Sequence, residues 1–178
     1  MNALATTLVL GGARSGKSTY AEGLIARSGP EAVYIATAEP HDDEMADRIA
    51  RHRERRGSGW TTVEEPLALA AVLRDASVPG RAVLVDCLTL WLSNLMAAEV
   101  NVEAAAAELC ATLAALPGPI VLVSNEVGLG LVPDTPLGRR FRDAQGRLNQ
   151  LVAAAVPSVV FVAAGLSLVL KSPAQEQA

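Results

Sequence analysis

Aromatic residues and cysteines are scarce in this sequence. Aromatic side chains make up 3% of the 178 residues, and the two cysteines, Cys87 and Cys110, have neither metal-ligand spacing nor a paired pattern. This excludes a disulfide-stabilised fold, and both cysteines are expected to be small buried residues in a reducing compartment. Alanine, valine and leucine must therefore build the core. The chain is long enough to bury one, so we expect a single domain over residues 1–178.

An excess of positive charge is also absent. The formal net charge is −4, and the arginines cluster instead of spreading, which argues against a nucleic-acid partner. Residues 1–12 have no positively charged start and no small-residue cleavage site, so they do not read as a signal peptide.

One long uncharged run, residues 151–170, has about the length of a membrane span. Pro157 and Gly165 interrupt it, which favours an alanine-rich helix end followed by two buried strands. We therefore expect a soluble, cytoplasmic protein with no stable membrane insertion.

Short β-branched runs alternate with helical patterns along the whole chain. The runs are continuously apolar, as expected for parallel strands buried on both faces. This alternation predicts an α/β fold, a three-layer sandwich around a mostly parallel sheet. The expected strands are residues 6–12, 32–38, 81–87, 119–126, 158–165 and 166–170, and the expected helices are 18–27, 43–56, 66–75, 88–97, 102–116 and 137–155.

The segment GGARSGKS, residues 11–18, fits the pattern G-x-x-x-x-G-K-[S/T]. An apolar strand precedes it and a helical pattern follows, which is the context that a phosphate-binding loop (P-loop) requires. Its backbone N–H groups and the helix N-terminus would surround phosphate oxygens, Lys17 would reach the β- and γ-phosphates, and Ser18 would ligate Mg²⁺. The alternative is a chance glycine-rich turn.

Asp86 ends the buried strand pattern RAVLVDC. P-loop proteins keep at this place a carboxylate that holds Mg²⁺, directly or through water. The alternative is an aspartate that caps the helix beginning near Leu88. The two roles are compatible.

One of the two histidines, His52, lies among arginines. If residues 43–56 are helical, His52 falls within about 60° of Met45 and Ile49, on the stripe that faces inward. Nearby cations disfavour the imidazolium form, which keeps the ring neutral and nucleophilic, and they would also receive phosphate charge. The alternative is a half-buried histidine in a solvated basic helix. His41 has less cationic company and ranks below His52.

A Gly/Pro-rich loop follows the strand that ends in Asn125 and Glu126. The helix after it carries Arg139, Arg140, Arg142 and Asp143. Loops after the carboxyl ends of parallel strands line the ligand crevice of open α/β sheets. An ordinary connection with solvated arginines is the alternative.

Several motifs together resemble one family. They are LVLGGARSGKS, YIATAEPHDDEMADRIARHRERRGSGW and NEVGLGLVPDTPLGRRFRDAQGRLNQ. The chain is similar over nearly its whole length to the bifunctional adenosylcobinamide kinase/adenosylcobinamide-phosphate guanylyltransferases of vitamin B12 assembly. The resemblance implies a P-loop NTPase (RecA-like) fold and a homotrimer. It also implies phosphorylation of adenosylcobinamide by ATP or GTP, followed by GMP transfer from GTP to adenosylcobinamide phosphate.

The same resemblance implies roles for individual residues. His52 aligns with the histidine that forms a covalent GMP intermediate, and Ser18 and Asp86 would hold Mg²⁺. The implied nucleotide contacts are Gly11, Gly12, Ala13, Arg14, Ser15, Gly16, Lys17, Ser18, Ala36, Thr37, Ala38, Arg53, Glu54, Arg55, Arg56, Glu64 and Asp86. Two other functions stay open: a P-loop kinase for another small alcohol without nucleotidyl transfer, and a RecA-like nucleotide switch.

Overall fold

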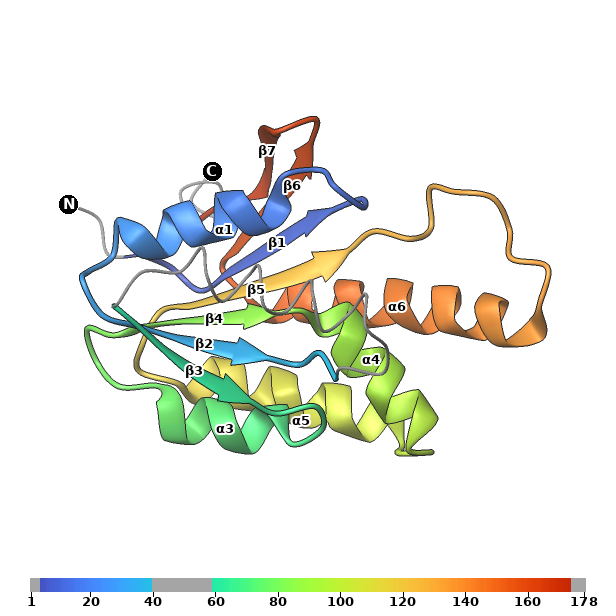
Figure 1. The fold of residues 1–178 in the computed structure, drawn as a ribbon, viewed down its shortest axis with the longest axis horizontal. Coiled ribbons are helices and arrows are strands. Elements are labelled where there is room, and N and C mark those ends of the chain that lie inside the picture. The colour runs from blue at the N-terminus through green and yellow to red at the C-terminus, as the bar shows by residue number, and fades with distance from the viewer. Residues whose placement is uncertain (1–3, 40–58, 174–178) are drawn as a thin grey trace.

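A computed structural model describes residues 4–39 and 59–173. Within these ranges the strands form one seven-stranded sheet in the order β3-β2-β4-β5-β1-β6-β7, with helices on both faces (Figure 1). The elements are β1 (Thr7–Gly11), α1 (Lys17–Ala26), β2 (Ala32–Ala36), β3 (Trp60–Glu64), α3 (Leu69–Ala76), β4 (Ala82–Asp86), α4 (Leu88–Ala97), α5 (Val102–Ala115), β5 (Ile120–Asn125), α6 (Pro136–Ala155), β6 (Ser158–Ala163) and β7 (Leu166–Lys171).

Two apolar clusters separate the three layers. One lies between the sheet and α3, α4, α5 and α6, and it contains Trp91, Leu109 and Leu148. The other lies under α1 and contains Ala21 and Ile25. The strands β1, β2 and β4 are buried along nearly their whole length, which explains their continuous apolar runs. The predicted three-layer α/β fold is confirmed.

All strand pairs are parallel except β6–β7, which is an antiparallel hairpin. The uncharged run of residues 151–170 therefore divides, as predicted, into the end of α6 and two strands. The predicted burial is wrong for β7, which among the described strands is an exposed edge strand with a strand partner on one side only. Within the described ranges, none of the helices has the length and apolar character needed to cross a membrane.

One strand was not predicted. Strand β3 pairs with β2 in parallel at the edge of the sheet, and none of its five residues is fully buried. It lacks the continuous apolar run of the central strands, although Thr61, Thr62 and Val63 are β-branched residues that favour strands. The predicted helix over residues 43–56 lies outside the described residues.

Candidate functional site

The P-loop connects β1 to α1, as the sequence pattern predicts. Strand β1 ends at Gly11, and α1 begins at Lys17 with Gly16 as its N-cap residue. The loop closes on itself, since the Ser15 N–H donates to the Gly12 carbonyl at 3.3 Å. Because α1 begins directly after this turn, the N–H groups of its first turn lie near the carboxyl end of β1. A helix N-terminus at this position favours the binding of a phosphate.

Two glycines make this turn possible. A Cβ atom at Gly11 would lie 2.5 Å from both the Ser15 Oγ and the Val162 carbonyl oxygen. Gly16 has φ 94°, and its Cβ would lie 3.2 Å from the Gly165 Cα in the β6–β7 turn. The left-handed conformation favours glycine for the second position, and the close approach of backbone requires it at the first.

The side chains of the P-loop differ in their hydrogen bonding and exposure. The Lys17 amino group donates to the Gly12 carbonyl at 3.1 Å, so the side chain folds back across the loop. The Ser15 hydroxyl is buried and has no hydrogen-bond partner among the described residues. Ser18 follows Lys17 in the first turn of α1 and is half-buried. Ala13 and Arg14 are exposed at the tip of the loop.

Asp86 lies at the carboxyl end of β4, on the same edge of the parallel sheet as the P-loop. Its carboxylate accepts a hydrogen bond from the Tyr34 hydroxyl at 3.1 Å. The N-cap residue of α4 is Cys87, and no side chain caps that helix. The capping alternative for Asp86 therefore finds no support.

The charges of Lys17 and Asp86 both affect the thiol of Cys87. Burial and, to a smaller extent, the Asp86 carboxylate raise the pKa of the Cys87 thiol to about 11, although the Lys17 ammonium acts in the opposite direction. Both charges therefore influence the same buried sulfur, which directly follows β4. The thiol stays protonated and unreactive at neutral pH, as expected of a small buried residue.

The oxygen atoms at this edge suit Mg²⁺. Hydroxyl and carboxylate oxygens are ligands that Mg²⁺ prefers, and it keeps several waters beside one or two protein groups and the phosphates. Ser18 is the second residue of α1 and Asp86 is the last residue of β4, so each offers such oxygen atoms at the P-loop edge. These residues fit the predicted metal role.

Thr37 follows β2 and is fully buried. Its N–H donates to the Asp86 carbonyl at 3.3 Å, and its carbonyl accepts from the Asn94 side chain at 2.7 Å. The Thr37 hydroxyl is bonded to the main chain of Cys87. Thr37 thus positions the backbone at the end of β4, where Asp86 lies, while its predicted nucleotide contact stays a prediction.

The other predicted contacts at this edge vary in exposure. Ala36 is the last residue of β2 and is buried, and Ala38 is half-buried just beyond Thr37. Glu64 ends the neighbouring strand β3 and is exposed. The predicted catalytic His52, together with His41 and the predicted contacts Arg53, Glu54, Arg55 and Arg56, lies outside the described residues.

A buried polar network holds the end of β5 beside the P-loop. The Gln145 amide donates to the Ser124 hydroxyl at 2.9 Å, and that hydroxyl donates to the Asn149 side chain at 2.7 Å. The Asn149 amide in turn donates to the Asn125 carbonyl at 3.1 Å. The Glu126 N–H then donates to the Gly11 carbonyl at 3.1 Å. Gln145 was missed from the sequence, because its partner Ser124 is 21 residues away.

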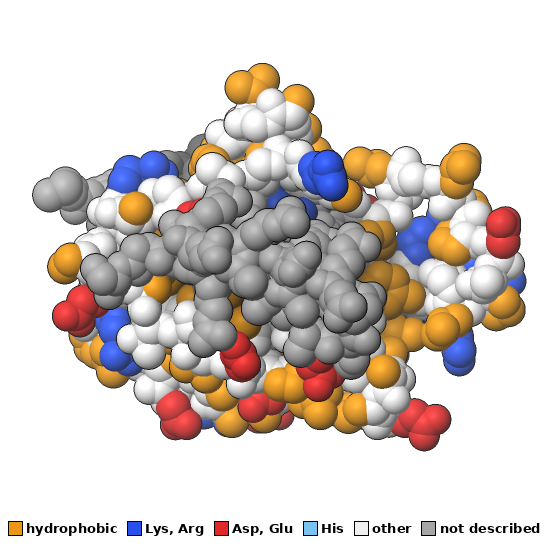
Figure 2. Space-filling view, in the orientation of Figure 1, with side chains coloured by type: hydrophobic (Ala, Val, Ile, Leu, Met, Phe, Trp, Pro, Cys, Tyr) orange, Lys and Arg blue, Asp and Glu red, His pale blue; other side chains and the backbone are white. Residues whose placement is uncertain are grey.

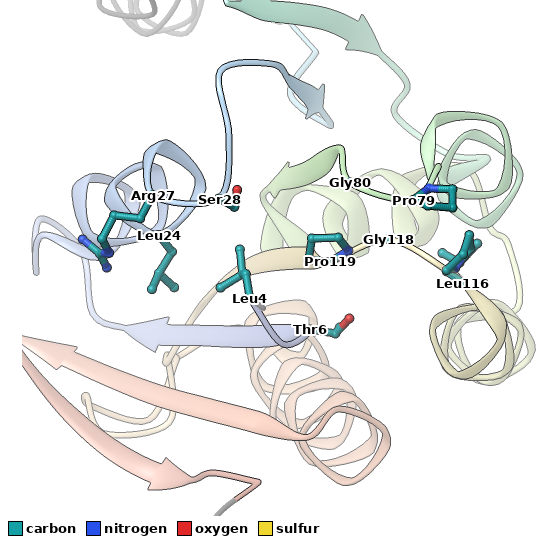
Figure 3. Close-up of a pocket in the computed structure, with 11 residues that line it drawn as sticks. Leu4, Thr6, Leu24, Arg27, Ser28, Pro79, Gly80, Leu116, Gly118 and Pro119 are labelled. Carbon is teal, nitrogen blue, oxygen red and sulfur yellow. The ribbon is translucent and has the colours of Figure 1, made fainter. Parts of the chain in front are cut away.

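A pocket of about 840 Å³ lies at the opposite edge of the sheet (Figure 3). Leu4 and Thr6 precede β1, Pro119 precedes β5, and Arg27 follows α1, so the pocket faces the amino ends of the strands. The P-loop and Asp86 lie at the carboxyl ends. Ligands of open α/β sheets bind at the carboxyl ends, so we do not assign the nucleotide site to this pocket.

Comparison with solved structures supports the fold. An ATPase from the type III secretion system of pathogenic bacteria aligns with a TM-score of 0.56 at 14% identity, covering 93% of this chain and 56% of that chain. The RadB recombinase aligns with a TM-score of 0.53 at 16% identity, covering 88% of this chain and 73% of the recombinase chain. At such identities the likeness concerns the fold alone, and it confirms the predicted P-loop NTPase (RecA-like) architecture.

Comparison with curated proteins supplies closer relatives. The chain is 52% identical over 166 residues to the bifunctional adenosylcobalamin biosynthesis protein CobP of Pseudomonas aeruginosa, covering 92% of this chain and 96% of that protein. It is 41% identical over 179 residues to the bifunctional adenosylcobalamin biosynthesis protein CobU of Escherichia coli K12, covering 92% of this chain and 98% of that protein. Residues 7–170 match the family described as cobinamide kinase / cobinamide phosphate guanyltransferase. The chain therefore belongs to this family of bifunctional enzymes of cobalamin biosynthesis.

Proposed function

We propose that this enzyme phosphorylates adenosylcobinamide with ATP or GTP and then transfers GMP from GTP to adenosylcobinamide phosphate through a covalent GMP–histidine intermediate at His52. The family membership supports the two activities. The P-loop with Lys17 and the acid Asp86 at one edge of the sheet supports a nucleoside triphosphate as the common substrate.

In the kinase step, the aminopropanol hydroxyl of adenosylcobinamide attacks the γ-phosphorus. The bond from that phosphorus to the bridging oxygen breaks, the hydroxyl loses its proton, and ADP or GDP leaves. The first-turn N–H groups of α1 and the Lys17 ammonium bind the β- and γ-phosphates. Ser18 and Asp86 would hold Mg²⁺, which neutralises charge on the phosphates when bound.

In the guanylyl step, the attacked atom is the α-phosphorus of GTP. A ring nitrogen of His52 forms a bond to it as pyrophosphate leaves, and the P-loop then cradles the departing pyrophosphate. A phosphate oxygen of adenosylcobinamide phosphate attacks the same phosphorus and breaks the P–N bond, which gives adenosylcobinamide-GDP and frees His52. A covalent intermediate divides one difficult transfer into two displacements.

Further nucleotide contacts are proposed beyond the P-loop. Ala36, Thr37, Ala38 and Glu64 lie at the carboxyl ends of β2 and β3, on the edge that the P-loop occupies. We also propose that Arg53, Glu54, Arg55 and Arg56 take part, that the enzyme is a homotrimer, and that it works in the cytoplasm.

Two labelled substrates test the function. With GTP labelled at the α-phosphorus, the enzyme should retain label on the protein after denaturation and release pyrophosphate. With ATP labelled at the γ-phosphorus, label should pass to adenosylcobinamide. A kinase without nucleotidyl transfer would move the γ-label alone, and a nucleotide switch would move neither label to a product.

A further inference from the structure

The turn between β6 and β7 is the part of this hairpin that meets the P-loop. Ala163 lies opposite Leu166 in the register of the two strands. The turn is therefore formed by Ala164 and Gly165, which both have a left-handed backbone, with φ values of 51° and 79°. Two-residue turns of this kind match the twist of a hairpin, and their own hydrogen bond joins the residues on either side of the turn. The N–H groups of the two turn residues are therefore free to bind elsewhere.

The turn lies beside the P-loop but outside the core. Figure 1 shows it close to the loop that joins β1 to α1, and Figure 2, in the same orientation, shows the hairpin as the highest part of this face. Ala164 and Gly165 are exposed, and neither belongs to the two apolar clusters. A change in the turn should therefore leave the packing of the core intact.

One hydrogen bond joins the turn to the P-loop. The Gly165 N–H donates to the Ser15 carbonyl at 2.8 Å. The two backbones also touch, because a Cβ atom at Gly16 would lie 3.2 Å from the Gly165 Cα and 3.7 Å from its nitrogen. The turn thus contacts both residues of the peptide unit that joins Ser15 to Gly16, directly before α1.

This peptide unit sets the direction of one N–H group of the P-loop. It is trans, and in a planar trans peptide the carbonyl and the N–H point in opposite directions. Because Gly165 holds the Ser15 carbonyl toward the hairpin, the Gly16 N–H points away from it, and that N–H has no hydrogen-bond partner among the described residues. The Ser15 hydroxyl is likewise buried without a partner in this part of the chain. Two neighbouring polar groups are thus left for an anion, as in a phosphate-binding loop.

We propose that Gly165 is a positioning residue of the triphosphate site, whose N–H fixes the peptide unit between Ser15 and Gly16 so that the Gly16 N–H is aimed at a phosphate before the nucleotide arrives. This role rests on the proposed function, because the ligand of the P-loop is taken to be a nucleoside triphosphate. An unsupported peptide unit would rotate, and binding would then carry the entropic cost of ordering it. The hairpin bond removes that cost, so it strengthens the binding of the phosphates and leaves the binding of the guanine base unchanged.

The test removes the N–H of residue 165 without adding a side chain. Cell-free translation of the full chain with glycolic acid at this position replaces the amide by an ester, which has no N–H. Calorimetry then measures the binding of tripolyphosphate, of GTP and of GMP, which lacks the β- and γ-phosphates. Tripolyphosphate and GTP should bind about tenfold more weakly than to the wild type, which corresponds to the loss of one ordinary hydrogen bond. GMP should bind as it does to the wild type.

The neighbouring residue of the turn supplies a matched control. Lactic acid at position 164 replaces the Ala164 amide by an ester and keeps the methyl side chain. The Ala164 N–H makes no hydrogen bond to the P-loop, so this chain should bind tripolyphosphate as the wild type does. Gly165→Asn is the conservative variant, because it keeps the N–H and asparagine tolerates a left-handed backbone. No atom lies within 4 Å of where its Cβ would be, and the variant should retain most of the affinity for tripolyphosphate.

Hydrogen exchange tests the same coupling in the wild-type protein. Coupling between two sites is reciprocal, so tripolyphosphate should slow the exchange of the Gly165 N–H by about the factor that the ester loses in affinity. Exchange that tripolyphosphate does not change would overturn the proposal. If the ester chain does not fold, this measurement decides alone.

A folded Gly165 ester, verified by circular dichroism, gives the other decisive outcomes. If it binds tripolyphosphate as tightly as the wild type and only melts at a lower temperature, the hydrogen bond merely stabilises the hairpin and the proposal is wrong. An equal loss of affinity for GMP and GTP would contradict it as well. A wild type that binds neither tripolyphosphate nor GTP would instead show that the P-loop assignment, and with it the proposed function, fails.

Discussion

The side chain of Thr37 ties the end of β2 to the residue that follows β4. Its hydroxyl donates a hydrogen bond to the Cys87 carbonyl at 2.7 Å and accepts one from the Cys87 N–H at 2.9 Å. Both bonds are buried, and together with the Thr37 N–H bonded to the Asp86 carbonyl they fix the backbone that directly follows the Asp86 Cα. The acid at the P-loop edge is thus positioned by a residue that precedes it by 49 positions.

Replacing Thr37 by valine should destabilise the protein. Valine keeps the shape but leaves the buried Cys87 N–H without a partner, which costs about 1–3 kcal/mol. The Cys87 carbonyl loses one of two hydrogen bonds and keeps the one from the Trp91 N–H at 3.1 Å. Urea unfolding followed by circular dichroism should show a lower midpoint. Thr37→Ser keeps the hydroxyl and should recover much of the loss. Equal midpoints for Thr37→Val and the wild type would show that the hydrogen bonds of the Thr37 hydroxyl contribute little to stability.

Lys17→Ala should impair both activities, because the same ammonium binds the triphosphate in each step. We expect loss of most of the kinase and guanylyl transfer rates and weaker GTP binding, measured by calorimetry. Lys17→Arg keeps the positive charge but not the compact shape of the ammonium group. It should therefore recover GTP binding more than it recovers the two transfer rates. Wild-type affinity and rates in Lys17→Ala would overturn the P-loop assignment.

Asp86→Asn should raise the Mg²⁺ requirement far more than it lowers stability. The amide is a poor metal ligand, but it has a similar shape and its oxygen can still accept the Tyr34 hydrogen bond. The rate as a function of Mg²⁺ concentration gives the shift, and thermal melting gives the stability. Tyr34→Phe removes the same hydrogen bond and keeps the carboxylate, so it serves as the control. An unchanged Mg²⁺ requirement with a lowered melting temperature would assign Asp86 a structural role.

Local patterns predicted most of this fold. The P-loop could be found because its glycines, lysine and flanking elements are adjacent in sequence, and the central strands because their burial on both faces leaves continuous apolar runs. Strand β3 was missed because an edge strand needs no such run. The roles of Asn94 and Gln145 could not be predicted, because they depend on partners 57 and 21 residues away that the fold brings together.

His52→Ala should abolish guanylyl transfer and spare part of the kinase activity. In the proposed mechanism the histidine carries GMP, whereas γ-phosphate transfer to adenosylcobinamide needs no protein nucleophile. The wild-type enzyme incubated with α-labelled GTP should hold label through a P–N bond, which is labile in acid and comparatively stable in alkali, opposite to a serine ester. His52→Ala should hold none.

His41→Ala is the matched control, because it removes the other histidine of the chain, and it should keep full labelling. If His52→Ala still accumulates acid-labile label, the covalent residue is another one, and His41 becomes the first to test. If neither single variant loses label and the label resists acid, the intermediate is not a histidine adduct, and the nucleophilic role predicted for His52 is wrong.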